Sequence, residues 1–457
     1  MKSCLKPLLG LALAALTSLA GAQQPPPAAA ASAPPPQVQA QAPQPPAAVS
    51  ASARRLYERS KGQLLQIRTL LKSQDSQASV GSGFLVSDDG HVVTNYHVIS
   101  QFALEPDSYR LRYATTDGQG GALELLDFDV RRDLALLRAA DGGLKGRGAL
   151  AFRPQSQPLA KGERIYSMGN PHDVAFAVVE GNYNGLVERS FDPLIYYAGG
   201  INPGMSGGPV LDEDGRVVGV NVSTLLFAQQ VSFLVPGQFA ESLVGRSLAA
   251  RPIRSAAWSR LRDQLTAYQD ELVARFLALP WESANNKRYR LPVPRQDFMR
   301  CWGRSTAADS KGLDYERSQC RMDHALFVGG GLQTGWLDMS HEAYDGRKLG
   351  ALRFARQYSD SFRNERLGRA DKSGTAPYCK EQFVDRAGLP LRAVVCLRAY
   401  RKLEGLHDLS VLVTTVDDSR QGALGRFDAR GVSFDNALKL VAHYLEGFAW
   451  TTASKPR

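Results

Sequence analysis

Between about residues 64 and 244, short apolar runs alternate with turn-forming residues. Runs such as 64–71, 82–86 and 134–137 are separated by signals such as Asp88-Asp89-Gly90 and Asp212-Glu213-Asp214-Gly215. Many short apolar segments with frequent turns and no long helical repeat indicate antiparallel β-structure. We therefore predict an all-β domain over residues 53–245, built as two small antiparallel barrels, with a short helix at 53–59 at its start.

Beyond residue 245 the pattern changes to a helical stripe. Apolar residues spaced alternately by three and four occupy 255–279: Trp258, Leu261, Leu265, Tyr268 and Leu272. This spacing predicts an amphipathic helix packed on its own domain. A short coiled-coil seam between copies is the alternative, although few heptads are present to support it.

The remainder, 255–457, is predicted to be a second, α+β module. Runs such as 391–397 and 409–415 read as strands, and 435–450 reads as a final helix. The module contains four cysteines: Cys301, Cys320, Cys379 and Cys396. Four cysteines allow three connectivities, and proximity favours Cys301 with Cys320 and Cys379 with Cys396. Tighter paired spacings would be needed for a zinc site, so no metal is predicted.

The first 22 residues have the three parts of a signal peptide. Lys2 and Lys6 precede the apolar run 8–16, and Ala20-Gly21-Ala22 supplies a cleavage site. Residues 23–52 are rich in Pro, Ala and Gln and are read as a disordered tether, because they offer little apolar surface to bury. A periplasmic or secreted protein, cleaved near Ala22, is therefore expected.

Candidate chemistry gathers at residues 202–210, Asn-Pro-Gly-Met-Ser-Gly-Gly-Pro-Val. Glycines around Ser206 let the backbone turn sharply, so the hydroxyl can be exposed while nearby N–H groups converge. Gly204 can most easily aim its N–H beside that of Ser206 to form an oxyanion hole. An ordinary Gly/Pro-rich turn is the alternative interpretation.

Two upstream segments supply a base and a carboxylate. Val92-Val93-Thr94-Asn95-Tyr96-His97 reads as part of a strand pair that ends at the histidine, and Asp133 opens the apolar run 134–137. A nucleophile, a base and an orienting carboxylate can be contributed in any chain order. The order here is His97, Asp133, Ser206.

These ordered motifs, G-S-G-F-L-V, T-N-Y-H-V-I, D-L-A-L-L, G-N-P and I-N-P-G-M-S-G-G-P-V, resemble trypsin-like serine proteases of the HtrA (Deg) type over residues 55–245. The resemblance implies a double β-barrel, with His97 as general base, Asp133 as its orienting carboxylate and Ser206 as nucleophile. Met205 departs from the Asn common at that position in the family. No PDZ domain is recognised in the C-terminal module, to which the family gives no guide.

The same resemblance places Gly200 at the floor of the primary specificity pocket. No carboxylate is present there to bind Lys or Arg. Ile201, together with Val231 and Phe233 of a strand similar to the pocket-lining strand of the family, predicts apolar substrate-binding walls. Barrel core is the alternative for residues of that strand.

The charge distribution and the weaker motifs add little to the prediction of function. The chain carries a net charge of +10, all of it in 251–457. Such spread charge usually means a solvated surface, and the alternative is an acidic envelope partner. Gly329-Gly330-Gly331 lacks the Lys-Ser/Thr of a phosphate loop, and His341 and His443 lack a zinc-helix partner and are expected at the surface.

The sequence thus predicts an exported serine endopeptidase that acts on polypeptides without a cofactor. Export argues against a nucleic-acid partner, and a homo-oligomer is left open. The competing classes are a non-catalytic binding or sensor protein on a protease scaffold, and an esterase that uses the same triad.

Overall fold

The computed structural model describes residues 50–224, 230–286, 288–307, 312–362 and 367–451. The predicted signal peptide and nearly all of the predicted tether lie outside these ranges. Residues Val49–Arg457 form one compact unit. Within the described ranges, no helix combines the length and hydrophobicity that crossing a membrane requires.

The first barrel closes in the order β1-β2-β3-β6-β5-β4, with every neighbouring pair antiparallel. Alternation along a strand sends side chains inward and outward in turn, as in β5, where Leu123 and Leu125 are buried and Ala122 is exposed. Its strands are β1 (Leu64–Leu71), β2 (Ser76–Leu85), β3 (His91–Thr94), β4 (Tyr109–Thr115), β5 (Gly120–Asp129) and β6 (Leu134–Ala139).

The second barrel closes in the order β10-β11-β12-β9-β8-β7. Its strands are β7 (Arg164–Gly169), β8 (Ala177–Leu186), β9 (Ile195–Ala198), β10 (Pro209–Leu211), β11 (Val217–Thr224) and β12 (Ser232–Pro236). The two closed, six-stranded barrels confirm the predicted trypsin-like double barrel.

Short helices frame the barrels. The predicted helix at 53–59 is α1 (Ala51–Ser60), whose first turn is capped by the Ser50 side chain accepting from the Ala53 N–H. The 3₁₀ turn η1 (Lys61–Gln63) precedes β1, and α3 (Gly237–Ser247) follows β12. Between barrel strands lie α2 (Tyr96–Leu104) and the 3₁₀ turn η2 (Pro171–Asp173). The predicted strand ending at His97 is wrong: β3 stops at Thr94, and His97 lies in the first turn of α2.

The C-terminal module is built mainly from strands. A seven-stranded antiparallel sheet runs in the order β15-β16-β19-β23-β22-β21-β20. Its strands are β15 (Arg300–Ser305), β16 (Asp314–Arg321), β19 (Leu337–Asp345), β20 (Tyr378–Arg386), β21 (Leu389–Ala399), β22 (Leu406–Thr415) and β23 (Gln421–Ser433). Smaller sheets are formed by β13 (Glu282–Asn286), β14 (Tyr289–Val293) and β24 (Ala449–Trp450), and by the hairpin β17 (Leu326–Gly329) and β18 (Leu332–Thr334). The predicted α+β class stays a prediction.

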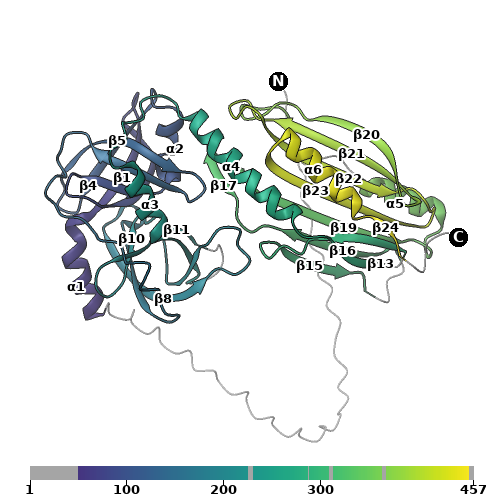
Figure 1. Cartoon of the computed structure of the whole chain (residues 1–457), viewed down its shortest axis with the longest axis horizontal. Helices are drawn as coiled ribbons and strands as arrows, with labels where there is room; N and C mark the ends of the chain where they lie inside the picture. Colours follow the sequence, from purple (N-terminus) through teal and green to yellow (C-terminus); the bar gives the residue numbers. More distant parts are fainter. Residues whose placement is uncertain (1–49, 225–229, 287, 308–311, 363–366, 452–457) are drawn as a thin grey trace, which may run out of the picture. The chain divides into compact units, whose positions relative to one another are not determined.

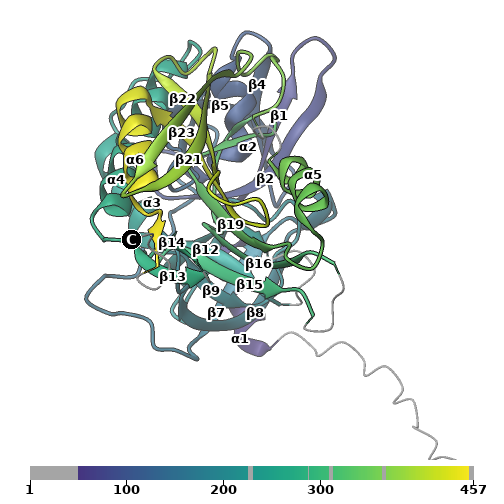
Figure 2. The same cartoon turned by 90° about the vertical axis from the view of Figure 1, so that its right-hand side faces the viewer.

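Helices cover both faces of the large sheet. α4 (Trp258–Leu277) and α6 (Phe434–Glu446) pack on the face that carries Phe427 of β23, and Figure 1 shows α6 lying over the sheet. α5 (Ala351–Ser361) packs through Phe354 against Leu424, which faces the other side because successive strand residues alternate (Figure 2). The predicted final helix stops short, at Glu446, and the chain continues into β24.

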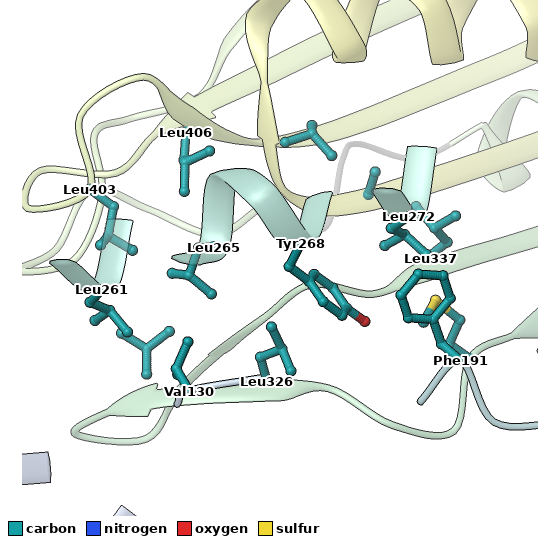
Figure 3. Close-up of a cluster of buried hydrophobic side chains, with 14 of the residues drawn as sticks. Val130, Phe191, Leu261, Leu265, Tyr268, Leu272, Leu326, Leu337, Leu403 and Leu406 are labelled. Atoms are coloured by element: carbon teal, nitrogen blue, oxygen red, sulfur yellow. The ribbon is translucent and has the colours of Figure 1, made fainter. Parts of the chain in front are cut away.

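The apolar stripe of α4 is buried within the chain itself. Leu261, Leu265 and Leu272 are each at most 2% exposed and belong to one core cluster with Val130 of the first barrel and Phe427 of the module. Figure 3 shows Leu265 pointing toward Val130 and Tyr268 toward Phe191. The coiled-coil alternative is therefore not supported, and α4 joins the buried core of the first barrel to that of the module.

Two disulfides staple neighbouring strands of the large sheet. Cys301 of β15 pairs in register with Cys320 of β16, and Cys379 of β20 with Cys396 of β21. These are the pairs that sequence proximity favoured. The surface position expected for His341 is wrong, because its ring is 3% exposed and bonds to the Tyr444 hydroxyl at 3.0 Å.

Candidate active site

His97 and Asp133 form a tight pair on the first barrel. The Nδ1 atom of His97 lies 2.5 Å from Oδ2 of Asp133, and the backbone N–H of His97 donates to Oδ1 of the same carboxylate at 2.8 Å. The first N–H groups of a helix lack partners within the helix, so the start of α2 is suited to an anionic side chain. The carboxylate thereby fixes both the ring and the turn that carries it.

The backbone of Asp133 is held in an unusual conformation. Its φ of 52° is in the left-handed region, which Asp tolerates better than most residues. Its carbonyl oxygen accepts from the Tyr96 N–H at 3.1 Å and from Nδ2 of the buried Asn95 at 2.7 Å. Two neighbours of His97 therefore help to hold the turn that directs the carboxylate toward the imidazole.

The pair also sets the protonation chemistry of His97. Burial by itself lowers the pKa of His97, but the charge of Asp133 and the hydrogen bond to it raise that pKa by more, and the net shift is upward. Because Nδ1–H donates to the carboxylate, the neutral ring carries its acceptor lone pair on Nε2. An imidazole held in this way can accept a proton from a hydroxyl group.

Ser206 lies in the loop between β9 and β10 of the second barrel. Gly204, two residues earlier, has a φ of 95°, and a Cβ there would collide with the Asn170 carbonyl oxygen and lie 3.1 Å from the His172 nitrogen. Among the described residues, no acceptor is found for the N–H of Gly204 or of Ser206. Two such donors on one tight loop are what binding an oxyanion requires.

The loop of Ser206 packs closely against the first barrel. A Cβ on Gly207 would lie 2.8 Å from the backbone nitrogen of Asn95, so only glycine fits beside the residues that lead to His97. The Ser206 carbonyl oxygen accepts from the Ser82 N–H of β2 at 2.7 Å. These contacts bring the segments of His97, Asp133 and Ser206 together across the two barrels.

Ser82 is a site residue whose role the sequence interpretation missed. Its buried hydroxyl donates to the Gly204 carbonyl oxygen at 2.7 Å and accepts from the Asn170 N–H at 2.9 Å. It thus ties the loop of Ser206 to β2 and to the end of β7. The motif G-S-G-F was noticed as part of a family pattern, but nothing local in it indicates this contact.

The predicted substrate-binding residues occupy different environments. Gly200 is partly exposed, with open space where a Cβ would stand, and Ser232 holds its turn by donating to the Gly199 carbonyl oxygen at 2.8 Å. Ile201 is buried in the core of the second barrel. Val231 and Phe233 line a cavity of about 1070 Å³.

Comparisons with known proteins agree with this architecture. Residues 81–220 match the model of the trypsin-like peptidase domain. A probable periplasmic serine endoprotease DegP-like of Chlamydia pneumoniae is 32% identical over 181 residues, which cover 38% of this chain and 35% of that protein. Serine protease HTRA1 of Xenopus laevis is 30% identical over 194 residues, which cover 40% of this chain and 39% of the relative.

A crystal structure of the serine endoprotease from Yersinia pestis aligns with a TM-score of 0.37 and 22% identity, over 43% of this chain and 67% of that one. The chain spans little more than a third of the length of the curated relatives it matches. The two barrels are thus similar to the protease domain of HtrA-type serine proteases, and residues 81–220 match the trypsin-like peptidase domain.

Proposed function

We propose that this protein is a serine endopeptidase in which His97 is the general base, Asp133 orients it and Ser206 is the nucleophile. One observation carries the proposal. Asp133 occupies Nδ1 of His97 and leaves Nε2 as the basic atom of the ring, while the loop of Ser206, in which no acceptor is found for two N–H donors among the described residues, packs against Asn95 just before His97. The relatives named as serine proteases support the same reaction class.

The reaction would proceed in two balanced halves. Nε2 of His97 takes the proton of the Ser206 hydroxyl as Oγ attacks the scissile carbonyl carbon, and the N–H groups of Gly204 and Ser206 stabilise the resulting oxyanion. The imidazolium, stabilised by Asp133, then protonates the leaving amine as the C–N bond breaks. Water attacks the acyl-enzyme by the same route in reverse and regenerates the free serine.

Cleavage after small or medium aliphatic residues is the proposed preference. Among the described residues, no atom beyond those of Gly200 and its chain neighbours lies within 4 Å of the position that a Cβ on Gly200 would take, so a charged side chain there would lose its hydration without gaining a partner. Unfolded or exposed polypeptide segments are the proposed substrates, because an endopeptidase needs an extended stretch of chain to enter the site.

Export to the cell envelope is also part of the proposal. The relatives from Chlamydia pneumoniae and Marinomonas are described as probable periplasmic endoproteases, and four cysteines joined in two disulfides suit an oxidising compartment. The N-terminal sequence also supports export, because its apolar run has the features of a signal peptide and is followed by Pro/Ala-rich residues.

The decisive test is hydrolysis of an unfolded protein by the purified chain, with Ser206→Ala beside it and Ser76→Ala, an exposed serine of β2, as the matched control. We expect Ser206→Ala to lose hydrolysis and fluorophosphonate labelling, and Ser76→Ala to keep both. Equal hydrolysis by wild type and Ser206→Ala would exclude the proposed serine endopeptidase activity. Cleavage of esters without cleavage of any peptide would favour the esterase instead.

A further inference from the structure

A hairpin of the C-terminal module lies directly against the helix that carries His97. The Tyr96 hydroxyl, at the start of α2, donates to the Val328 carbonyl oxygen of β17 at 2.8 Å, and both residues are fully buried. At the base of the hairpin, the Tyr268 hydroxyl of α4 donates to the Gly335 carbonyl oxygen at 3.1 Å. The hairpin is thus fixed at its centre to the first barrel and at its base to α4.

The hairpin presents one aromatic side chain to His97. Leu326 and Val328, each at most 1% exposed, lie in the buried core, whereas Phe327 is only partly buried and packs at the edge of that core. The Phe327 ring meets the His97 ring edge to face, with centroids 6.3 Å apart. Gly330 and Gly331, both with positive φ, form the two-residue turn that lets the strands double back.

A cavity of about 410 Å³ lies between this hairpin and the barrels. The barrels contribute His97, Asp133, Leu194 and Val222 to its lining, and the module contributes His324 and Phe327. Leu194 and His324 also line the larger cavity that contains Val231 and Phe233, so the two cavities adjoin. Neither the barrels nor the module alone encloses the space beside His97.

The charged groups that line this cavity are paired, and Asp323 of the lining pairs with Arg300 outside it at 2.7 Å. Asp192, a buried carboxylate of the lining, pairs with Arg131 at 2.7 Å and with Arg132 at 2.8 Å. Burial lowers the pKa of His324, which favours a neutral ring. A charged substrate side chain would find no unpaired counter-ion among these groups, whereas an apolar one would contact Leu194, Val222 and Phe327.

We propose that the hairpin β17–β18 completes the substrate cleft and that Phe327 forms one wall of a subsite for an apolar side chain of the polypeptide substrate, close to the scissile bond. The inference rests on the proposed endopeptidase activity. It assigns to the C-terminal module a direct part in substrate selection. Loss of the Phe327 ring would remove an apolar contact with large substrate side chains but would leave His97, Asp133 and Ser206 in place.

The test uses the full-length protein with Phe327→Ala, Phe327→Trp and Phe383→Ala, the last being an exposed phenylalanine of β20 in the same module. Peptides carrying Ala, Val, Leu or Phe at each position near the scissile bond give kcat/KM ratios, and a small fluorophosphonate reports the reactivity of Ser206. Thermal melts check that each variant is folded.

At one position, we expect Phe327→Ala to reduce the preference for Leu or Phe over Ala by about tenfold or more, since apolar pocket contacts discriminate by such factors. Phe327→Trp should shift the preference toward smaller side chains, which keeps the proposal testable if the Ala variant fails to fold. Labelling of Ser206 should persist in both variants, because neither removes His97, Asp133 or Ser206, and Phe383→Ala should change neither readout.

Unchanged ratios in the folded Phe327 variants, with normal labelling, would overturn the subsite while leaving the endopeptidase intact. A uniform rise of kcat/KM for every peptide would also overturn it, because the hairpin would then be a block rather than a wall. Absence of labelling in the wild type would instead remove the proposed function on which the subsite rests.

Discussion

Replacing Gly204 by alanine tests the oxyanion site most directly. The residue has a φ of 95°, which side-chain-bearing residues rarely adopt, and the added Cβ would overlap the Asn170 carbonyl oxygen. The left-handed backbone alone costs about 1 to 2 kcal/mol in an L-residue. The Gly204 peptide must therefore rotate or shift, which turns its N–H away from the position where the oxyanion forms.

Loss of one oxyanion donor lowers kcat by about 10²- to 10³-fold, or about 2.7 to 4 kcal/mol in the transition state. We expect that loss for Gly204→Ala in steady-state peptide hydrolysis, with KM changed far less. The matched control is Gly245→Ala in α3, an exposed glycine with open space around its Cβ position. It should keep full activity and gain about 0.5 to 1 kcal/mol of stability.

A folded Gly204→Ala protein with kcat within about threefold of wild type would refute this reasoning. Such a result would mean that the Gly204 N–H does not stabilise the transition state. The control for folding is an unrelated variant whose melting temperature falls as much as that of Gly204→Ala. If that variant loses as much kcat as Gly204→Ala does, the loss is due to destabilised folding instead.

Four further predictions concern the site and the module. His97 must be neutral to act as base, and its pKa is raised, so the acid limb of the kcat/KM profile should have its midpoint above pH 6.5. Asp133→Asn should lower that midpoint and should lower kcat by about 10⁴-fold. The imidazolium–Asp133 pair should likewise add stability below about pH 6.5 that is lost as pH rises through the folded pKa, which pH-dependent melts can detect. Ser82→Ala should reduce kcat more than Ser82→Thr does, since only the former removes the hydroxyl bonded to Gly204, and equal effects on kcat would contradict that role. Cys379→Ser should lower the free energy of unfolding of the module by about 3 kcal/mol while Ser206 labelling persists, as proteolysis and labelling together would report.

Local periodic signals predicted the elements that depend on local sequence. The helices at 53–59 and 255–279 appear as α1 and α4, and the strand expected at 64–71 is β1. Residues 92–99 misled the strand prediction because all of them except His97 are buried, whether in β3 or in α2. A segment buried on every side has no exposed period from which to tell strand from helix.

The end of the chain shows the same limit. The residues beyond Glu446 have a composition that would also suit a helix. In the structure, however, Gly447 packs against Pro292 and Trp281, and Trp450 pairs with Tyr289 of β14. Those partners lie more than a hundred residues upstream in the sequence. His341 was misjudged for a similar reason, since its burial depends on Tyr444 and Phe448 packing over β19.

The candidate site divides along this line as well. The sequence predicted His97, Asp133 and Ser206 because each lies in a short motif that by itself indicates a chemical role. Phe327 was not, because its meaning comes only from the fold, which returns β17 to a helix formed much earlier in the chain. The three glycines at 329–331 were read only as a failed phosphate loop, although two apolar runs around a Gly-Gly turn also fit a hairpin.

Tyr96 explains why the module cannot be treated as a separate appendage of the barrels. Its hydroxyl is fully buried, and a buried hydroxyl without a partner costs about 1 to 3 kcal/mol. The partner is the Val328 carbonyl oxygen of the module, whereas the N–H of the same tyrosine bonds to the Asp133 carbonyl oxygen. One residue therefore links the module to the turn that orients His97, so the packing of the hairpin and the geometry of the His97–Asp133 pair are parts of a single buried network.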